Sequence, residues 1–171
     1  MATHIGLPRA FLPGHCPLAA PHLITAFYPT FPTKISKHGV CVQQEAFTCG
    51  PAAAVTAARL HGHNLSVQQI AKAARSNPWF GSSAGDLARA IRQHGLDARI
   101  QSWPSLDHLE ADDVGALLIL KFSTRNDHWV CWLGYNEHGK HRIADPSQGL
   151  QIWCSETLKR RWRGRGISIR Q

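Results

Sequence analysis

The sequence lacks a paired cysteine pattern: its five cysteines form an odd number with no repeated spacing. This count does not favour a disulfide framework, leaves at least one thiol free and indicates a reducing compartment, for which we expect the cytoplasm. No run of about 18 apolar residues occurs, so we expect no transmembrane helix. Prolines also interrupt the N-terminal stretch, which has no basic start, and a secretory signal peptide is therefore not expected; these prolines are Pro8, Pro13, Pro17 and Pro21.

Acidic residues are few: 11 Asp and Glu stand against 19 Lys and Arg, which gives a formal net charge of +8. This balance suits a polyanion, a membrane surface or an acidic peptide, and charge alone does not choose among them. The densest basic cluster, 159–165, contains one tryptophan and could grip phosphates. We favour a solvated helix end followed by a turn, so nucleic acid is not an expected partner. Peripheral attachment at the inner face of a membrane stays open.

The chain has 171 residues, of which 43% are hydrophobic, and this is enough for one compact domain without structural metal. Residues 1–39 contain six of the ten prolines and no acidic residue, and they show neither helical nor alternating periodicity. This composition predicts an extended or disordered arm. We expect the folded domain to span residues 40–171.

Helical patterns come first along the chain, and strand patterns follow. We expect a helix over 52–61, a second from Ser66 to about residue 75 and a third from Ser83 up to Gly95, the last two opened by capping signals. Ser155 is predicted to cap a last short helix, and 136–139 to form a hairpin turn. Strand patterns occupy 97–101, 116–122, 128–135, 141–145, 150–153 and 167–169. This order predicts an α+β fold, with N-terminal helices packed on an antiparallel β-sheet.

Three residue types of a nucleophilic site stand at the edges of predicted elements. Cys49 lies directly ahead of the helix expected from residue 52, where orphan N–H groups and the helix dipole favour a thiolate. His128 opens an apolar run, and Asp145 closes the next one. A nucleophile, a base and an acid that orients the base are therefore all present.

Four motifs around these residues occur in a fixed order. They are Gln43-x5-Cys49-Gly50-Pro51-Ala52-Ala53, Asp127-His128-Trp129-Val130, Ala144-Asp145-Pro146 with Gly149 after it, and Arg161-Trp162-x-Gly164. Each motif is weak alone, but the set resembles peptidase family C39. Members of that family are papain-like cysteine peptidases that remove leader peptides after a double glycine, often as the N-terminal domain of bacteriocin-exporting ABC transporters. The resemblance covers roughly residues 40–170.

The resemblance implies a role for each residue: Cys49 as nucleophile, His128 as general base and later general acid, Asp145 as the group that holds the imidazole, and Gln43 as oxyanion donor. Elementary chemistry agrees with it. An amide six residues before the thiol can join the Cys49 N–H at a developing oxyanion. An Asp across a hairpin from the His can fix the tautomer of the imidazole. Gln44 is the nearest competitor for the oxyanion role, and the offset from the cysteine favours Gln43.

Two positions depart from the family pattern, which usually has Asp before Cys-Gly and Phe or Tyr after the His. Here Thr48 could cap the helix by its hydroxyl, and Trp129 still supplies an aromatic wall for a substrate cleft. Trp79 and Phe80 are further candidates for such walls, with ordinary core aromatics as the equal alternative. By resemblance the scissile bond follows Gly-Gly, since bare backbone can enter a cleft that excludes larger side chains.

Two sequence features resemble cofactor sites, but each lacks a necessary part. Residues 134–141 nearly spell a phosphate-binding loop, but the run ends in His and stands in a strand-turn-strand context, so we expect no ATP binding. The pairs His61/His63 and His138/His141 lack partners at ligand spacing, so we expect neither a metal nor another cofactor.

Together these patterns predict a cysteine endopeptidase without the membrane and ATPase parts of a transporter. Its expected partners are a peptide or precursor-protein substrate and an ABC exporter encoded nearby. One alternative is a deamidase or transglutaminase-type effector, because the same site can pass its acyl group to water or to an amine. Another is a module that binds leader peptides or nucleic acid without cleavage, against which the intact Cys49 and His128 argue.

Overall fold

The computed structural model describes residues 30–109, 113–122 and 127–171, and the arm predicted over 1–39 lies outside them as far as residue 29. Within these residues the helices are α2 (Cys49–Leu60), α3 (Val67–Ala73), α4 (Ala84–Gln93) and α5 (Ser155–Arg161), with a 3-10 turn, η1, at Leu106–His108. The strands are β1 (Lys34–Ile35), β2 (Cys41–Val42), β3 (Asp97–Ser102), β4 (Leu117–Lys121), β5 (Asp127–Tyr135), β6 (His141–Asp145), β7 (Gly149–Trp153) and β8 (Trp162–Arg170).

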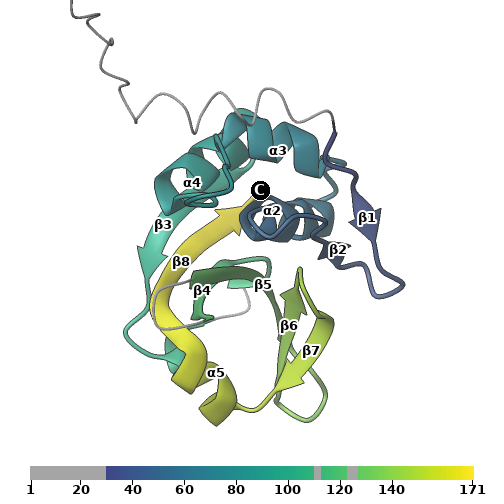
Figure 1. The fold of residues 1–171 in the computed structure, drawn as a ribbon. Helices are drawn as coiled ribbons and strands as arrows, with labels where there is room; N and C mark the ends of the chain where they lie inside the picture. The colour runs from purple at the N-terminus through teal and green to yellow at the C-terminus, as the bar shows by residue number, and fades with distance from the viewer. Residues whose placement is uncertain (1–29, 110–112, 123–126) are drawn as a thin grey trace, which may run out of the picture.

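Six of these strands form one sheet in the order β3-β8-β4-β5-β6-β7, and each neighbouring pair is antiparallel. The strands β1 and β2 pair with each other in a separate ribbon. Figure 1 shows α2, α3 and α4 together on one side of the strands, and α5 at the start of β8, away from the end of the chain. The predicted α+β fold, with helices on an antiparallel sheet, is confirmed.

The sheet separates two apolar cores, because side chains alternate between its faces. From β4, Leu117 and Ile119 join the core built with α2, α3 and α4. Leu118 and Leu120 join the second core, which includes Leu158 of α5. The continuous apolar run in β4 therefore reflects burial on both faces of the sheet.

Two of the three predicted serine caps are present. Ser66 forms a full capping box with Gln69, and the Ser83 hydroxyl accepts a hydrogen bond from the backbone of the first turn of α4. The prediction for Ser155 is wrong, because this serine is the first residue of α5 and Cys154 precedes it as the cap residue. The hydroxyl of Ser155 instead contacts the imidazole of the buried His141 at 3.2 Å.

The last strand is longer than the sequence predicts. The expected strand 167–169 is the buried part of β8, which begins at Trp162, so residues 162–165 of the basic cluster are strand rather than turn. Gly166 allows β8 to lie close to its partner β4, since a Cβ there would clash with the Leu117 carbonyl oxygen. The arginines of this segment show no apolar periodicity, so the sequence pattern did not predict a strand there.

Residues 30–39, which the predicted boundary at residue 40 assigned to the arm, pack on the domain. Phe31 is only 3% exposed and meets Phe47 edge to face, with ring centroids 5.7 Å apart. The backbone N–H of Phe31 donates to the side chain of Gln68, and the Thr33 hydroxyl accepts from the backbone at the start of α3. The folded domain therefore includes this segment.

Candidate active site

Cys49 is the first residue of α2, so the helix begins at the cysteine and not at residue 52 as predicted. The side chain is buried but lines a cleft. Gly50 packs closely, because a Cβ there would lie 3.2 Å from the side chains of both Leu87 and Ser82, which would have to shift by a few tenths of an ångström. Pro51 costs no hydrogen bond, because N–H groups of the first turn have no intrahelical partner.

The start of α2 is free of competing side chains. Thr48 occupies the cap position but makes no side-chain cap, contrary to prediction, and its hydroxyl donates to the Glu45 carbonyl at 2.9 Å. No acidic side chain stands in the first turn of α2. The positive end of the helix dipole therefore acts on the Cys49 sulfur without a neutralising carboxylate.

His128 and Asp145 come together because their strands are neighbours in the sheet. His128 is the second residue of β5 and Asp145 the last of β6, and both are buried. The imidazole Nε2 lies 2.8 Å from Asp145 Oδ1. This contact leaves the other ring nitrogen, Nδ1, for the thiol of Cys49, which lines the same cleft as His128 and is one of the groups that raise the pKa of His128.

Burial and hydrogen bonding act in opposite directions on the pKa of His128. Burial is the largest single influence and lowers it, but the hydrogen bonds to Asp145 and Cys49 and the charges of these groups outweigh burial and raise the pKa from 6.5 to about 9. For Asp145, burial raises the pKa, while His128 and Ser147 lower it by more, so the net direction is downward. The Asp145 carboxylate and the Cys49 sulfur therefore both favour the charged form of the imidazole.

Gln43 lies in the cleft and Gln44 does not. The Gln43 Nε2 donates to the Glu45 carbonyl at 3.3 Å, which uses one of its two hydrogens. The buried Oε1 of Gln43 has no hydrogen-bond partner among the residues that the structure describes. Gln44 is exposed, and its amide bonds to the carbonyls of Val42 and Gln43. Of the two candidates, only Gln43 lines the cleft that contains Cys49.

The cleft has a volume of about 610 Å³ and an aromatic rim. Trp79 is 58% exposed and Phe80 81% exposed, so the alternative that both are core aromatics is wrong. Trp129 is buried and forms part of the lining, whereas Phe122 is exposed and packs on the His128 ring at 5.5 Å. The full lining comprises Gln43, Ala46, Phe47, Cys49, Pro78, Trp79, Phe80, Gly81, Ser82, Phe122, Asp127, His128, Trp129 and Ser147.

A closed turn presents the two exposed aromatics. Asn77 is buried, and its Oδ1 accepts hydrogen bonds from the backbone of Trp79 at 3.2 Å and of Phe80 at 3.0 Å. Asn77 and Gly81 also exchange two backbone hydrogen bonds, with Gly81 at φ +63°. The rings are therefore exposed on a backbone that is already ordered.

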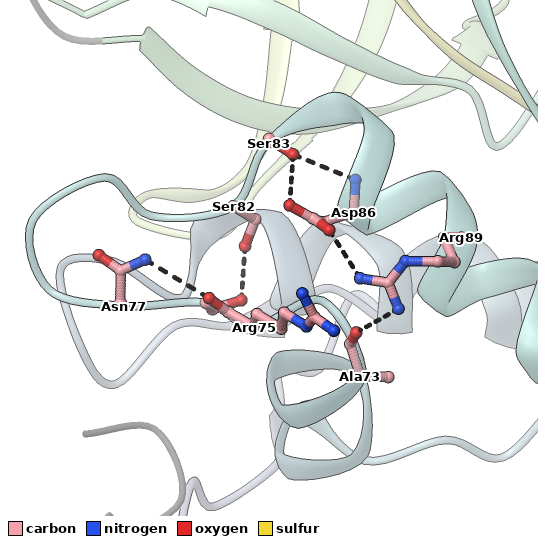
Figure 2. Close-up of polar contacts among 8 residues, drawn as sticks. Ala73, Arg75, Asn77, Ser82, Ser83, Asp86 and Arg89 are labelled. Carbon is pink, nitrogen blue, oxygen red and sulfur yellow. Dashed lines mark hydrogen bonds and ion pairs between the residues drawn. The ribbon is translucent and has the colours of Figure 1, made fainter. Parts of the chain in front are cut away.

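Further polar contacts tie this turn to the helices and the sheet. The hydroxyls of Ser76 and Ser82 lie 2.6 Å apart in the interior, and the Trp129 indole donates to the Ser82 carbonyl at 3.1 Å. In Figure 2, Ser82 is followed by Ser83, the cap residue of α4, and the Ser83 hydroxyl contacts Asp86. Further contacts drawn from Asp86 in the same figure lead to α3. One wall of the cleft is thus held by α3, α4 and β5 together.

The family model of the peptidase C39 family matches residues 37–171. The chain belongs to this family. Membership supports a peptidase role, and the match covers all four candidate residues Gln43, Cys49, His128 and Asp145. A comparison with curated protein sequences finds no significant match.

Solved structures similar to this C39 chain are peptidase domains. The double glycine motif protease from an AMS/PCAT transporter, solved with a leader peptide, has a TM-score of 0.65 and 20% identity over 83% of this chain and 95% of its own. The peptidase domain of Streptococcus ComA, a bifunctional ABC transporter, has a TM-score of 0.67 and 19% identity over 75% of this chain and 95% of its own. The peptidase C39-like domain of a Vibrio parahaemolyticus toxin secretion protein has a TM-score of 0.57 and 16% identity over 76% of this chain and 99% of its own. At these identities the likeness shows the fold.

The other sequence features of this C39 chain have structural roles. Residues 134–141 connect β5 to β6 through the predicted turn, closed by hydrogen bonds between Asn136 and Lys140 and between Gly139 and Asn136. His141 is buried and receives the indole N–H of Trp132. Across residues 30–109, 113–122 and 127–171, no group of three or more His, Cys, Asp or Glu side chains is placed to hold a metal ion. The helices in these ranges are all too short or too polar to cross a membrane.

Proposed function

We propose that this C39 chain is a cysteine peptidase that cleaves peptide or precursor leaders after Gly-Gly. The observation that carries the proposal is a cleft lined by the Cys49 thiol, at the start of α2, and by the His128 imidazole, whose Nε2 lies 2.8 Å from the buried Asp145 carboxylate. A nucleophile, a proton carrier and its orienting acid are the parts that acyl transfer requires.

In the first half of the reaction the Cys49 thiolate attacks the scissile carbonyl carbon, and the electron pair of the C=O bond moves to oxygen. The Cys49 backbone N–H and the second hydrogen of the Gln43 amide donate to this oxyanion. His128, present as the imidazolium, then gives its proton to the departing amine as the C–N bond breaks. The products are the free amine and a thioester on Cys49.

In the second half, water attacks the thioester carbonyl while the now neutral His128 accepts a proton from it. The C–S bond breaks, the carboxylic acid leaves, and the thiolate and imidazolium return. Asp145 keeps the imidazole oriented through both steps and does not transfer a proton itself. The buried Nε2 to Oδ1 contact supports this division of roles.

The aromatic lining of the cleft supports a preference for small residues at the scissile bond. Trp129 is buried in the lining, and the exposed Trp79 and Phe80 rings of the ordered turn line the same cleft. We assign these three aromatics to substrate binding, where they restrict the space beside Cys49 to backbone. The family resemblance supplies Gly-Gly as the pair that fits, and an ABC exporter as the partner that would carry the released peptide.

The test is a library of synthetic leaders ending in Gly-Gly and followed by several core residues, incubated with the purified chain and analysed by mass spectrometry. We expect one cut after the second glycine, and none when either glycine is Val, because a β-branched side chain displaces the scissile carbonyl from Cys49. Equal cleavage of Gly-Val leaders would refute the double-glycine preference. Release of ammonia without chain cleavage would establish the deamidase alternative, and binding without any product would establish the binding module.

A further inference from the structure

The Asp145 carboxylate accepts hydrogen bonds from a residue that lies outside the sequence motifs. Ser147, two positions after it in the turn between β6 and β7, donates to Asp145 Oδ1 from its backbone N–H at 2.8 Å and from its hydroxyl at 2.7 Å. The same oxygen receives His128 Nε2 at 2.8 Å. Three donors therefore converge on one carboxylate oxygen.

The two residues of this contact differ in their exposure to solvent. Asp145 is 4% exposed, so water has little access to its carboxylate, whereas Ser147 is exposed and also lines the cleft. Without the hydroxyl, a buried carboxylate would lose a donor that solvent replaces poorly. The turn itself is held separately, because the Pro146 carbonyl accepts from the Gln43 backbone at 2.9 Å.

We propose that Ser147 is a positioning residue, whose hydroxyl fixes the rotation of the Asp145 carboxylate so that Oδ1 faces the imidazole of His128. The proposal rests on the proposed function, since it assigns Ser147 to the same site. Both donors of Ser147 favour the charged carboxylate, and they contribute to the lowered pKa of Asp145. Ser147 acts through Asp145 and is not itself a catalytic residue.

Within the part of the chain that the structure describes, few other charges bear on this pair of side chains. The titratable group that faces the imidazole from α2 is the Cys49 thiol. The carboxylate next along β5, Asp127, is paired with Arg163 of β8 at 2.9 Å. A change at Ser147 therefore reaches His128 through Asp145, and its effect can be measured on the His128 ring.

The experiment follows the titration of the His128 imidazole by NMR in the full chain, which needs no substrate. In Ser147→Ala we expect the pKa of His128 to fall from about 9 by about one unit or more, because the carboxylate is no longer held toward Nε2. Ser147→Thr keeps a hydroxyl, and the exposed position has room for a methyl group, so it should restore the value. Ser105→Ala is the matched control, since the Ser105 hydroxyl likewise donates to a nearby carboxylate, that of Asp107, far from the site in sequence.

Kinetics on a Gly-Gly leader give the second measurement. Ser147→Ala should lower kcat about tenfold with KM unchanged, and Ser147→Thr should recover it. A raised KM with unchanged kcat would overturn the proposal, because it would make Ser147 a substrate contact. An unchanged His128 titration in Ser147→Ala would also overturn it. If the wild-type chain cleaves no peptide, the proposed function fails, whereas the NMR comparison still decides the role of Ser147.

Discussion

Replacing Asp145 by asparagine removes the charge beside His128 and keeps the size of the side chain. Burial lowers the pKa of His128, but the hydrogen bond to Asp145 is the largest influence that raises it, and the net result is about 9 instead of 6.5. That difference is worth about 3 kcal/mol in favour of the imidazolium. Much of this stabilisation depends on a carboxylate that the variant lacks.

We expect Asp145→Asn to return the pKa of His128 toward 6.5 and to move the alkaline limb of kcat/KM with it. In the wild-type chain this limb should lie near pH 9, because loss of the imidazolium proton removes the acid that protonates the leaving amine. Asparagine can still hold the ring in part, so kcat/KM should fall by about 100-fold to 10,000-fold without reaching zero.

The assay is kcat/KM on a Gly-Gly leader across the range from about pH 5 to 10, together with NMR titration of His128. Asp97→Asn is the control, because Asp97 is also paired, with Arg99 at 2.9 Å, but stands on the edge strand β3, four positions from β6 in the sheet order. The reasoning is refuted if Asp145→Asn keeps both full kcat/KM and a His128 pKa of about 9.

Three further predictions follow from the same contacts. Phe31→Ala should lower the free energy of unfolding by about 3 to 5 kcal/mol, because a buried ring is lost, and an unchanged urea midpoint would contradict the packing of residue 31. The double variant Trp79→Ala, Phe80→Ala should raise KM while changing stability by less than about 1 kcal/mol, since both rings are exposed; an unchanged KM would remove them from substrate binding. The stabilisation from His128, whose pKa is raised on folding, should be fully present below about pH 6.5 and lost as the pH rises through about 9, so urea unfolding should show stability falling across this window, and a flat profile would contradict the raised pKa.

Much of the fold could be predicted because its signals are local. The caps at Ser66 and Ser83 and the apolar periods of the strands depend on residues within one turn or one strand. The meeting of His128 and Asp145 could be anticipated as well, since strands joined by a short hairpin pair directly. The chemical roles of these residues stay predictions.

Other features depend on partners distant in the sequence. Phe31 stands in a proline-rich stretch without periodicity, and its burial requires Phe47 and the start of α3. The place of Trp129 in the cleft wall depends on the hydrogen bond from its indole to the Ser82 carbonyl, which is distant in the sequence. Ser147 had one local signal, a serine two residues after an aspartate, which is a common turn pattern. Its convergence with His128 on one oxygen required the geometry of the neighbouring strands.

Cleavage of a Gly-Gly leader by the wild-type chain and by Cys49→Ala, compared by product mass, tests the central claim most directly. The variant removes one buried sulfur atom and should fold, which circular dichroism can verify. The account predicts a single cut after the second glycine by the wild-type chain and no turnover by Cys49→Ala, because the thioester can no longer form. Cleavage by Cys49→Ala at the wild-type rate would contradict it.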